Sequence, residues 1–105
     1  MGRMNWYYDN MKVVVDANFK VIGRFEPPIV FEFHQEEVTI AELLRRLQQL
    51  LPHINFLEKD LPGDDLRQLK VNQDHMPITL DVLGFPLKDG DEVFVGIYLE
   101  PLGGG

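Results

Sequence analysis

The segment that most constrains the fold is a helix whose start, end and buried face can all be read from the sequence. Thr39 and Glu42 stand at the spacing of a capping box, in which the threonine hydroxyl accepts from an N–H of the first turn and the glutamate carboxylate reaches back to the cap. Pro52 prevents continuation, because proline lacks the N–H that another turn requires. The apolar residues between them recur at helical spacing: Ile40, Leu43, Leu44, Leu47, Leu50 and Leu51. The sequence therefore predicts one amphipathic helix whose apolar stripe packs into the core.

Strand signals surround this helix. Residues 11–17 and 29–33 are rich in β-branched and aromatic side chains, and a hairpin that joins them would make the two strands antiparallel. Asp89-Gly90 is a turn pair, because glycine supplies the positive φ that tight turns demand. The other predicted elements are an irregular stretch at 52–68 with a helical turn near 64–68, and strands at 69–72, 76–80 and 91–99.

This order of elements predicts the fold class. A hairpin, a crossing helix and further strands, with no repeat and no linker, indicate an α+β domain with a mixed sheet of four to five strands and the helix packed on one face. That arrangement is the β-grasp, or ubiquitin-like, fold. The 105 residues fit one domain. We assign residues 1–10 to an N-terminal extension, 11–102 to the β-grasp domain and 103–105 to a flexible glycine tail.

Composition excludes several classes of protein. The absence of cysteine rules out disulfides, thiol nucleophiles and thiolate metal sites. The net charge of −7 disfavours nucleic acid, because phosphate backbones repel an acidic surface; it either speeds encounter with a basic partner or simply keeps the protein in solution. No apolar run reaches the roughly 18 residues of a membrane span, and no signal peptide opens the sequence. We expect a cytoplasmic protein that binds neither nucleic acid nor membrane.

No catalytic centre is predicted within the chain. The three histidines, His34, His53 and His75, lack the spacing of metal ligands, so we expect no metal site. Serine is absent, which leaves no nucleophile for a histidine and an aspartate to activate. The acidic pairs at 36–37 and 64–65 are typical of solvated charge at strand ends and in loops.

The last third of the sequence has a recognisable order of motifs. The motifs are Val71-Asn72, the turn Pro86-Leu87-Lys88-Asp89-Gly90-Asp91-Glu92-Val93, and the end Pro101-Leu102-Gly103-Gly104-Gly105. In this order, after a hairpin and a capped helix, they resemble the ubiquitin-like sulfur carriers, which include the small subunit of molybdopterin synthase and the thiamine-pathway carrier. The resemblance covers about residues 11–105. It departs from the family in a longer stretch at 94–100, a third glycine, the long loop at 52–68 and the ten extra N-terminal residues.

The resemblance implies a carrier protein that is not itself an enzyme. A terminal carboxylate is ionised at neutral pH and a poor electrophile, so it must be activated before it accepts sulfur. The chain has no Gly-x-x-x-x-Gly-Lys loop for ATP phosphates, so it binds no cofactor and a partner uses the ATP. The implied partners are an adenylating enzyme of the ubiquitin-activating type, a sulfurtransferase or cysteine desulfurase that supplies a persulfide, and an acceptor synthase subunit in molybdopterin- or thiamine-like biosynthesis.

The site residues that the resemblance implies all lie at the C-terminal end. Gly105 would carry the acyl-adenylate and then the thiocarboxylate, while the glycines before it would let the backbone approach a partner closely. Pro101 would stiffen the base of the tail. The expected partner-binding residues are Tyr98, Leu99, Pro101, Leu102, Gly103 and Gly104. For Tyr98, and for Phe94 on the same face of the strand, ordinary sheet packing is the competing interpretation.

Two other functions account for the same sequence. A ubiquitin-like modifier would be conjugated to other proteins through Gly105, and a β-grasp interaction module would not use its glycines at all. The sulfur carrier and the modifier both need a free terminal glycine, and they differ in the product formed. Deletion of Gly104 and Gly105 would leave an interaction module unaffected.

Overall fold

The predicted N-terminal hairpin is confirmed in the computed structural model, which describes residues 11–99. Strand β1 (Met11–Ala17) pairs antiparallel with β2 (Ile29–Phe33), with Val13 opposite Phe31. The other elements, in chain order, are β3 (Val38–Thr39), α1 (Ile40–Leu50), β4 (Leu57–Glu58), β5 (Leu61–Pro62), β6 (Leu66–Val71), β7 (Asp74–His75), the 3₁₀ helix η2 (Leu80–Gly84), β8 (Pro86–Leu87) and β9 (Glu92–Ile97).

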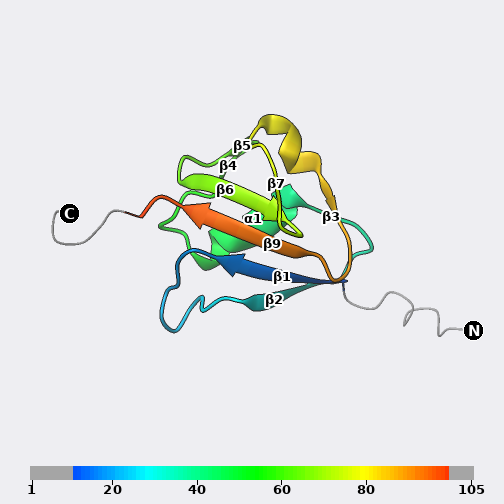
Figure 1. The fold of residues 1–105 in the computed structure, drawn as a ribbon, viewed down its shortest axis with the longest axis horizontal. Helices are drawn as coiled ribbons and strands as arrows, with labels where there is room; N and C mark the ends of the chain where they lie inside the picture. Colours follow the sequence, from blue (N-terminus) through cyan, green and yellow to red (C-terminus); the bar gives the residue numbers. More distant parts are fainter. Residues whose placement is uncertain (1–10, 100–105) are drawn as a thin grey trace, which may run out of the picture.

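The main sheet has five strands in the order β2-β1-β9-β6-β7 (Figure 1). β9 lies at its centre, parallel to β1 and antiparallel to β6, so the sheet is mixed. The chain enters the sheet through the β1–β2 hairpin, crosses it through α1 and returns to the centre in its last described strand. The structure is therefore an α+β fold with a mixed five-stranded sheet, as the order of elements predicted.

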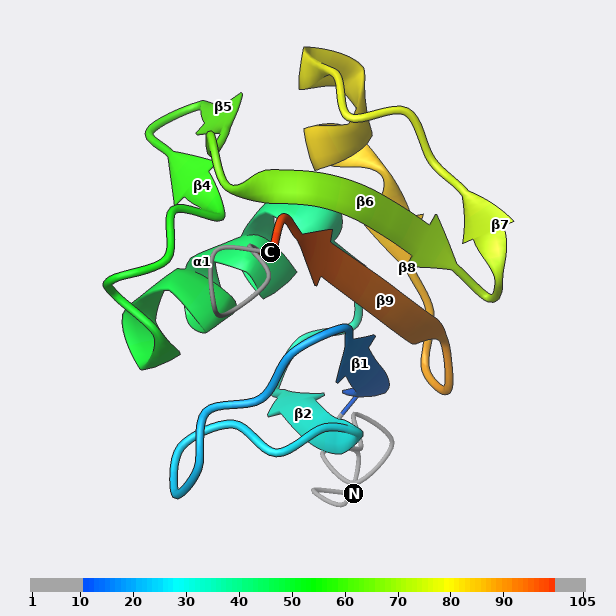
Figure 2. The same cartoon turned by 60° about the vertical axis from the view of Figure 1, so that its left-hand side comes forward.

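Helix α1 lies against one face of the sheet, and the core fills the space between them (Figures 1 and 2). Alternate residues of the three central strands point toward the helix and are buried. The buried helix residues are Ile40, Leu43, Leu44 and Leu47, and the buried strand residues opposite include Val13, Val15, Leu69, Val71, Val93 and Val95. The predicted apolar stripe is thus core packing, and no polar or charged residue among the described ones is buried.

The helix begins with the predicted capping box. The Thr39 N–H donates to Glu42 Oε1 over 2.9 Å, and the Glu42 N–H donates to Thr39 Oγ1 over 3.4 Å. The hydrogen bonds donated by the Gln35 side chain and by the Thr39 backbone hold the pKa of the Glu42 carboxyl below its usual value. At the other end the Leu51 N–H still donates to the Leu47 carbonyl, and Pro52 follows, as expected.

The predicted irregularity of 52–68 is only partly correct. β4 and β5 form a short hairpin there, and the helical turn predicted near 64–68 is wrong, because β6 starts at Leu66 and pairs with Ile97 of β9. Gln48 on α1 fixes this segment: its Oε1 accepts from the Phe56 and Leu57 N–H groups over 2.7 and 3.1 Å, and its Nε2 donates to the Ile54 carbonyl over 2.5 Å. A residue that looks like part of a solvated helix face therefore anchors the following loop.

Three predicted strands also differ from the observed ones. The strand expected at 69–72 is β6, which begins earlier, at Leu66, and ends at Val71. The strand expected at 76–80 is replaced by the two-residue β7, and η2 begins at Leu80. Pro77 lacks an N–H for the sheet, so pairing with β6 ends after the bond from the Met76 N–H to the Leu69 carbonyl. β9 is shorter than the expected 91–99. The turn at Asp89-Gly90 is confirmed, with φ of +89° at Gly90.

Residues 11–99 contain no helix that is both long enough and apolar enough to cross a membrane.

Candidate functional site

The candidate site is the end of β9, where the central strand leaves the sheet. Tyr98 and Leu99 follow its last residue, and their side chains are 66% and 51% exposed. Exposed side chains of this size contribute little to the core, so the sheet-packing interpretation of Tyr98 loses its basis. Both residues are free to contact another molecule, although their predicted role in partner binding stays a prediction.

Asn18 fixes the position of this exit. Its Nδ2 donates to the Ile97 carbonyl over 2.8 Å, and the Ile97 N–H donates to its Oδ1 over 3.0 Å. The amide therefore replaces the next residue of β1, which leaves the sheet after Ala17. This pair of bonds accounts for the end of β9 at Ile97, because among residues 11–99 no strand on the β1 side pairs with β9 beyond it.

Close backbone approach at Gly96 shapes the same end of the strand. A Cβ atom at this position would lie 2.9 Å from the Gln68 Cβ and 3.1 Å from its Oε1. The pairing of β6 with β9 is irregular here, between Leu66 and Gln68. Only glycine allows the two strands to approach this closely.

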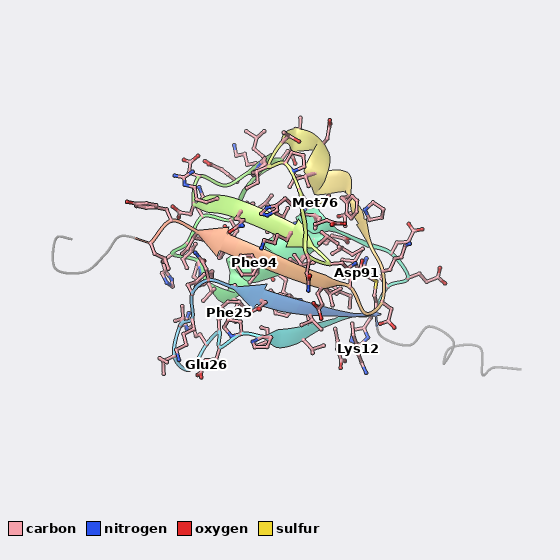
Figure 3. All side chains as sticks on the ribbon, in the orientation of Figure 1. Lys12, Phe25, Glu26, Met76, Asp91 and Phe94 are labelled. Carbon is pink, nitrogen blue, oxygen red and sulfur yellow. The ribbon has the colours of Figure 1, made fainter. Side chains whose placement is uncertain are left out.

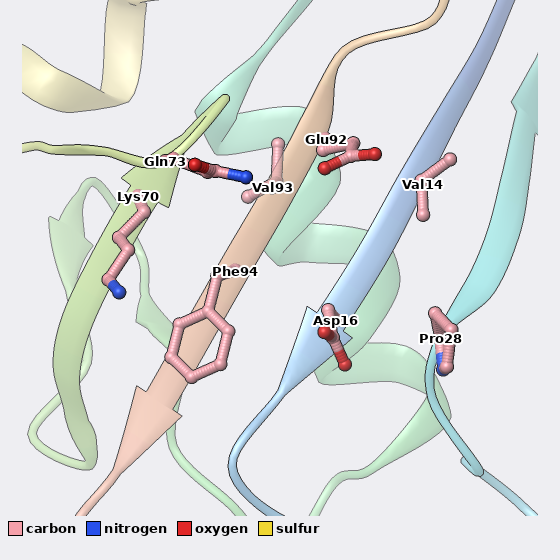
Figure 4. A pocket seen from close by; sticks show the side chains of 8 residues that line it. All are labelled: Val14, Asp16, Pro28, Lys70, Gln73, Glu92, Val93 and Phe94. Atoms are coloured by element: carbon pink, nitrogen blue, oxygen red, sulfur yellow. The ribbon is translucent and has the colours of Figure 1, made fainter.

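The open face of the sheet, opposite α1, carries a hollow of about 310 Å³ beside β9 (Figure 4). Figure 3 places Phe94 on the same sheet. The Lys70 ammonium lies 5.2 Å from the centre of the Phe94 ring, which suits a cation–π contact. Asp16 and Glu92 supply carboxylates along the β1 side, so the hollow has opposite charges on its two flanks. Phe94 is half-buried here and is not a core residue.

The rest of the predicted site lies outside the described residues. This applies to the predicted reactive residue and to most of the expected partner contacts, namely Pro101, Leu102, Gly103, Gly104 and Gly105. It also applies to the expected extension at 1–10. Among residues 11–99, no group of three or more histidine, aspartate or glutamate side chains could hold a metal ion, and His34, His53 and His75 are all exposed.

Sequence reasoning missed Asn18 and Lys70. Asn18 signals the end of a strand by residue type, but its long-range partner could not be read from the chain. Lys70 belongs to a strand of alternating burial, and this pattern indicates that its side chain points outward. The pattern does not indicate that an aromatic ring of the neighbouring strand lies beside it.

Comparison with known proteins supports the fold. No protein-family model matches the chain, and no curated protein matches it significantly. The solution structure of the Haloferax volcanii HVO 2177 protein matches with a TM-score of 0.63, over 87% of this chain and 86% of that one, at 18% sequence identity. At this identity the match concerns architecture alone. The class that fold and comparison together define is an α+β protein with one helix on a mixed five-stranded sheet.

Proposed function

We propose that the chain is a β-grasp sulfur carrier whose Gly105 is adenylated and then converted to a thiocarboxylate by partner enzymes. The observation that carries the proposal is that two exposed residues, Tyr98 and Leu99, follow the central strand β9, and that the sequence then runs through residues 100–102 to its glycines. The reacting group would thus follow a central strand that is paired on both sides, and the rest of the domain would serve to present it to partner enzymes.

The strand order supports the β-grasp assignment. An N-terminal hairpin, a single helix that crosses the sheet and a last strand returned parallel to β1 in the centre are what that fold requires. The motifs on which the resemblance rests lie at the ends of paired strands: Asn72 follows β6, and the turn at Asp89-Gly90 leads into β9.

The chemistry that we propose takes place in partner enzymes. The Gly105 carboxylate attacks the α-phosphorus of ATP and displaces pyrophosphate, which gives the acyl-adenylate. A persulfide on the sulfur donor then displaces AMP, and a second thiol of the donor splits the resulting acyl disulfide, which leaves the thiocarboxylate on Gly105 and a disulfide on the donor. The sulfur then passes to an acceptor in cofactor biosynthesis of the molybdopterin or thiamine type, in the cytoplasm.

Adenylation is the step to test first, because the interaction-module hypothesis predicts none. When the chain is incubated with ATP and its host's adenylating enzyme, pyrophosphate should be released in proportion to the amount of chain added. A variant without Gly104 and Gly105 keeps every described residue and should release none. Equal release by both proteins, or none from either, would refute the proposal. Adenylation followed by stable adducts on other proteins would instead assign the modifier function.

A further inference from the structure

The loop between β1 and β2 presents an apolar side chain to solvent. Ile22 is 73% exposed, more than any other large hydrophobic residue among the described ones. It occupies the tip of a tight hairpin, in which the Val21 carbonyl accepts from the Arg24 and Phe25 N–H groups over 2.9 and 2.8 Å. An apolar residue at such a tip gains nothing for the fold.

Backbone hydrogen bonds and a buried ring hold the tip in place. The Val21 N–H donates to the Phe25 carbonyl over 2.7 Å, and Glu26 Oε2 accepts from the Gly23 N–H over 2.8 Å. Below the tip, the fully buried Phe25 packs against Phe19, with ring centres 5.2 Å apart. These contacts order the backbone on both sides of Ile22, so little backbone freedom remains to be lost when its side chain is bound, which favours its use as an anchor.

The loop stands at the same end of the molecule as the exit of β9 (Figures 1 and 2). Asn18, its first residue, makes the two hydrogen bonds to Ile97 described above, so the loop and the exit are fixed relative to each other. Tyr98 and Leu99, also exposed, lie directly beyond that contact. A partner that covers the exit with an ordinary interface of about 800 Å² would reach the loop as well.

The charge of the loop differs from that of the whole chain. Lys20 and Arg24 flank Ile22 and are exposed, in a protein with a net charge of −7. Neither forms an ion pair with another described residue. Both cations are therefore available to carboxylates on a partner. A partner surface that is acidic would be attracted to this loop and repelled by the acidic rest of the protein.

We propose that this loop is a second docking point for the adenylating enzyme, which receives Ile22 in an apolar hollow bordered by acidic side chains. The inference rests on the proposed function and adds to it a surface that selects the partner. The C-terminal residues would deliver the carboxylate, and the loop would position the domain on the adenylating enzyme. The loop contributes binding and takes no part in the chemical step.

The test measures adenylation of the full chain by its host's enzyme, with carrier concentration varied. Ile22→Ser should raise KM for the carrier about tenfold and leave kcat unchanged, as expected for a lost binding anchor. Lys20→Glu with Arg24→Glu should raise KM most at low salt. The matched control is Leu80→Ser, which removes a 58% exposed leucine from η2, across the molecule (Figure 1), and should leave KM unchanged.

The outcomes separate the two proposals. If the wild-type chain is not adenylated at all, the proposed function fails and this partner with it. If it is adenylated and Ile22→Ser, shown to be folded by its thermal unfolding, has wild-type KM, the loop inference alone is refuted. If the wild-type chain self-associates, and Ile22→Ser abolishes this self-association without altering KM, the loop binds a second copy of the chain. That result would also refute the loop inference.

Discussion

Asn72 and Asp91, nineteen residues apart, are joined by a hydrogen bond of 3.0 Å from Asn72 Nδ2 to Asp91 Oδ1. The Asn72 Oδ1 accepts from the Glu92 N–H over 2.9 Å, and the second oxygen of Asp91 accepts from the Lys88 N–H over 2.8 Å. These bonds tie the end of β6 to the turn that starts β9. The two residues belong to separate motifs of the sequence, and the fold makes them one structural unit.

Asn72→Ala should therefore destabilise the protein by about 1–2 kcal/mol, measured by urea unfolding. It removes two side-chain hydrogen bonds and places alanine at φ of +50°, a region that asparagine tolerates better. Asn72→Gly keeps that backbone conformation accessible and loses only the bonds, so its destabilisation should be smaller. Equal stability of all three proteins would show that the unit has no energetic role.

The capping box predicts a difference between two threonines at helix starts. Thr39→Ala should lower the free energy of unfolding by about 1 kcal/mol, because the first turn of α1 loses its side-chain acceptor. Thr79 precedes η2 and makes no such hydrogen bond, so Thr79→Ala is the matched control and should have almost no effect. Equal losses in the two variants would contradict the account of the helix start.

The lowered pKa of Glu42 predicts that this residue accounts for part of the loss of stability at acid pH. Its pKa is lowered in the folded state, so its stabilising contribution is fully present above the ordinary value of 4.5 and is lost as the pH falls through the lower folded value. Glu42→Gln should flatten the loss of stability in that acid range. Glu36→Gln removes a nearby exposed carboxylate outside the box and serves as control. Identical acid profiles for wild type and Glu42→Gln would refute this prediction.

The close approach of β6 and β9 predicts that Gly96 does not tolerate a larger residue. Gly96→Ala should cost about 1–3 kcal/mol of stability, because the new methyl group would overlap the Gln68 side chain. Gly84→Ala adds the same methyl group where no heavy atom lies within 4 Å, so thermal unfolding should show little change. A Gly96→Ala variant as stable as wild type would mean that the two strands separate without penalty.

The sequence predicted those elements whose signals are local. The cap and leucine spacing gave α1 correctly, and alternation gave β1 and β2 with the observed bounds. Errors arose where distant residues decide the structure. The start of β6 at Leu66 depends on pairing with Ile97, and the loss of the strand expected at 76–80 reflects the missing N–H of Pro77 at the sheet edge.

The candidate site was predicted in part for the same reason. A motif at the end of the sequence drew attention to Tyr98 and Leu99, which the structure shows to be exposed. Asn18 and Ile22 lie some eighty residues earlier and carry no motif. Their place beside the exit follows from the parallel pairing of β1 with β9, a long-range contact that local patterns do not encode.

The central claim is that Gly105 becomes a thiocarboxylate, and the intact mass of the chain tests it most directly. After incubation with ATP, its host's adenylating enzyme and a persulfide donor, the mass should increase by the difference between one sulfur and one oxygen atom. The variant that lacks Gly105 should show no increase. An unchanged wild-type mass, with no acyl-adenylate trapped when the donor is omitted, would contradict the claim and favour a β-grasp interaction module.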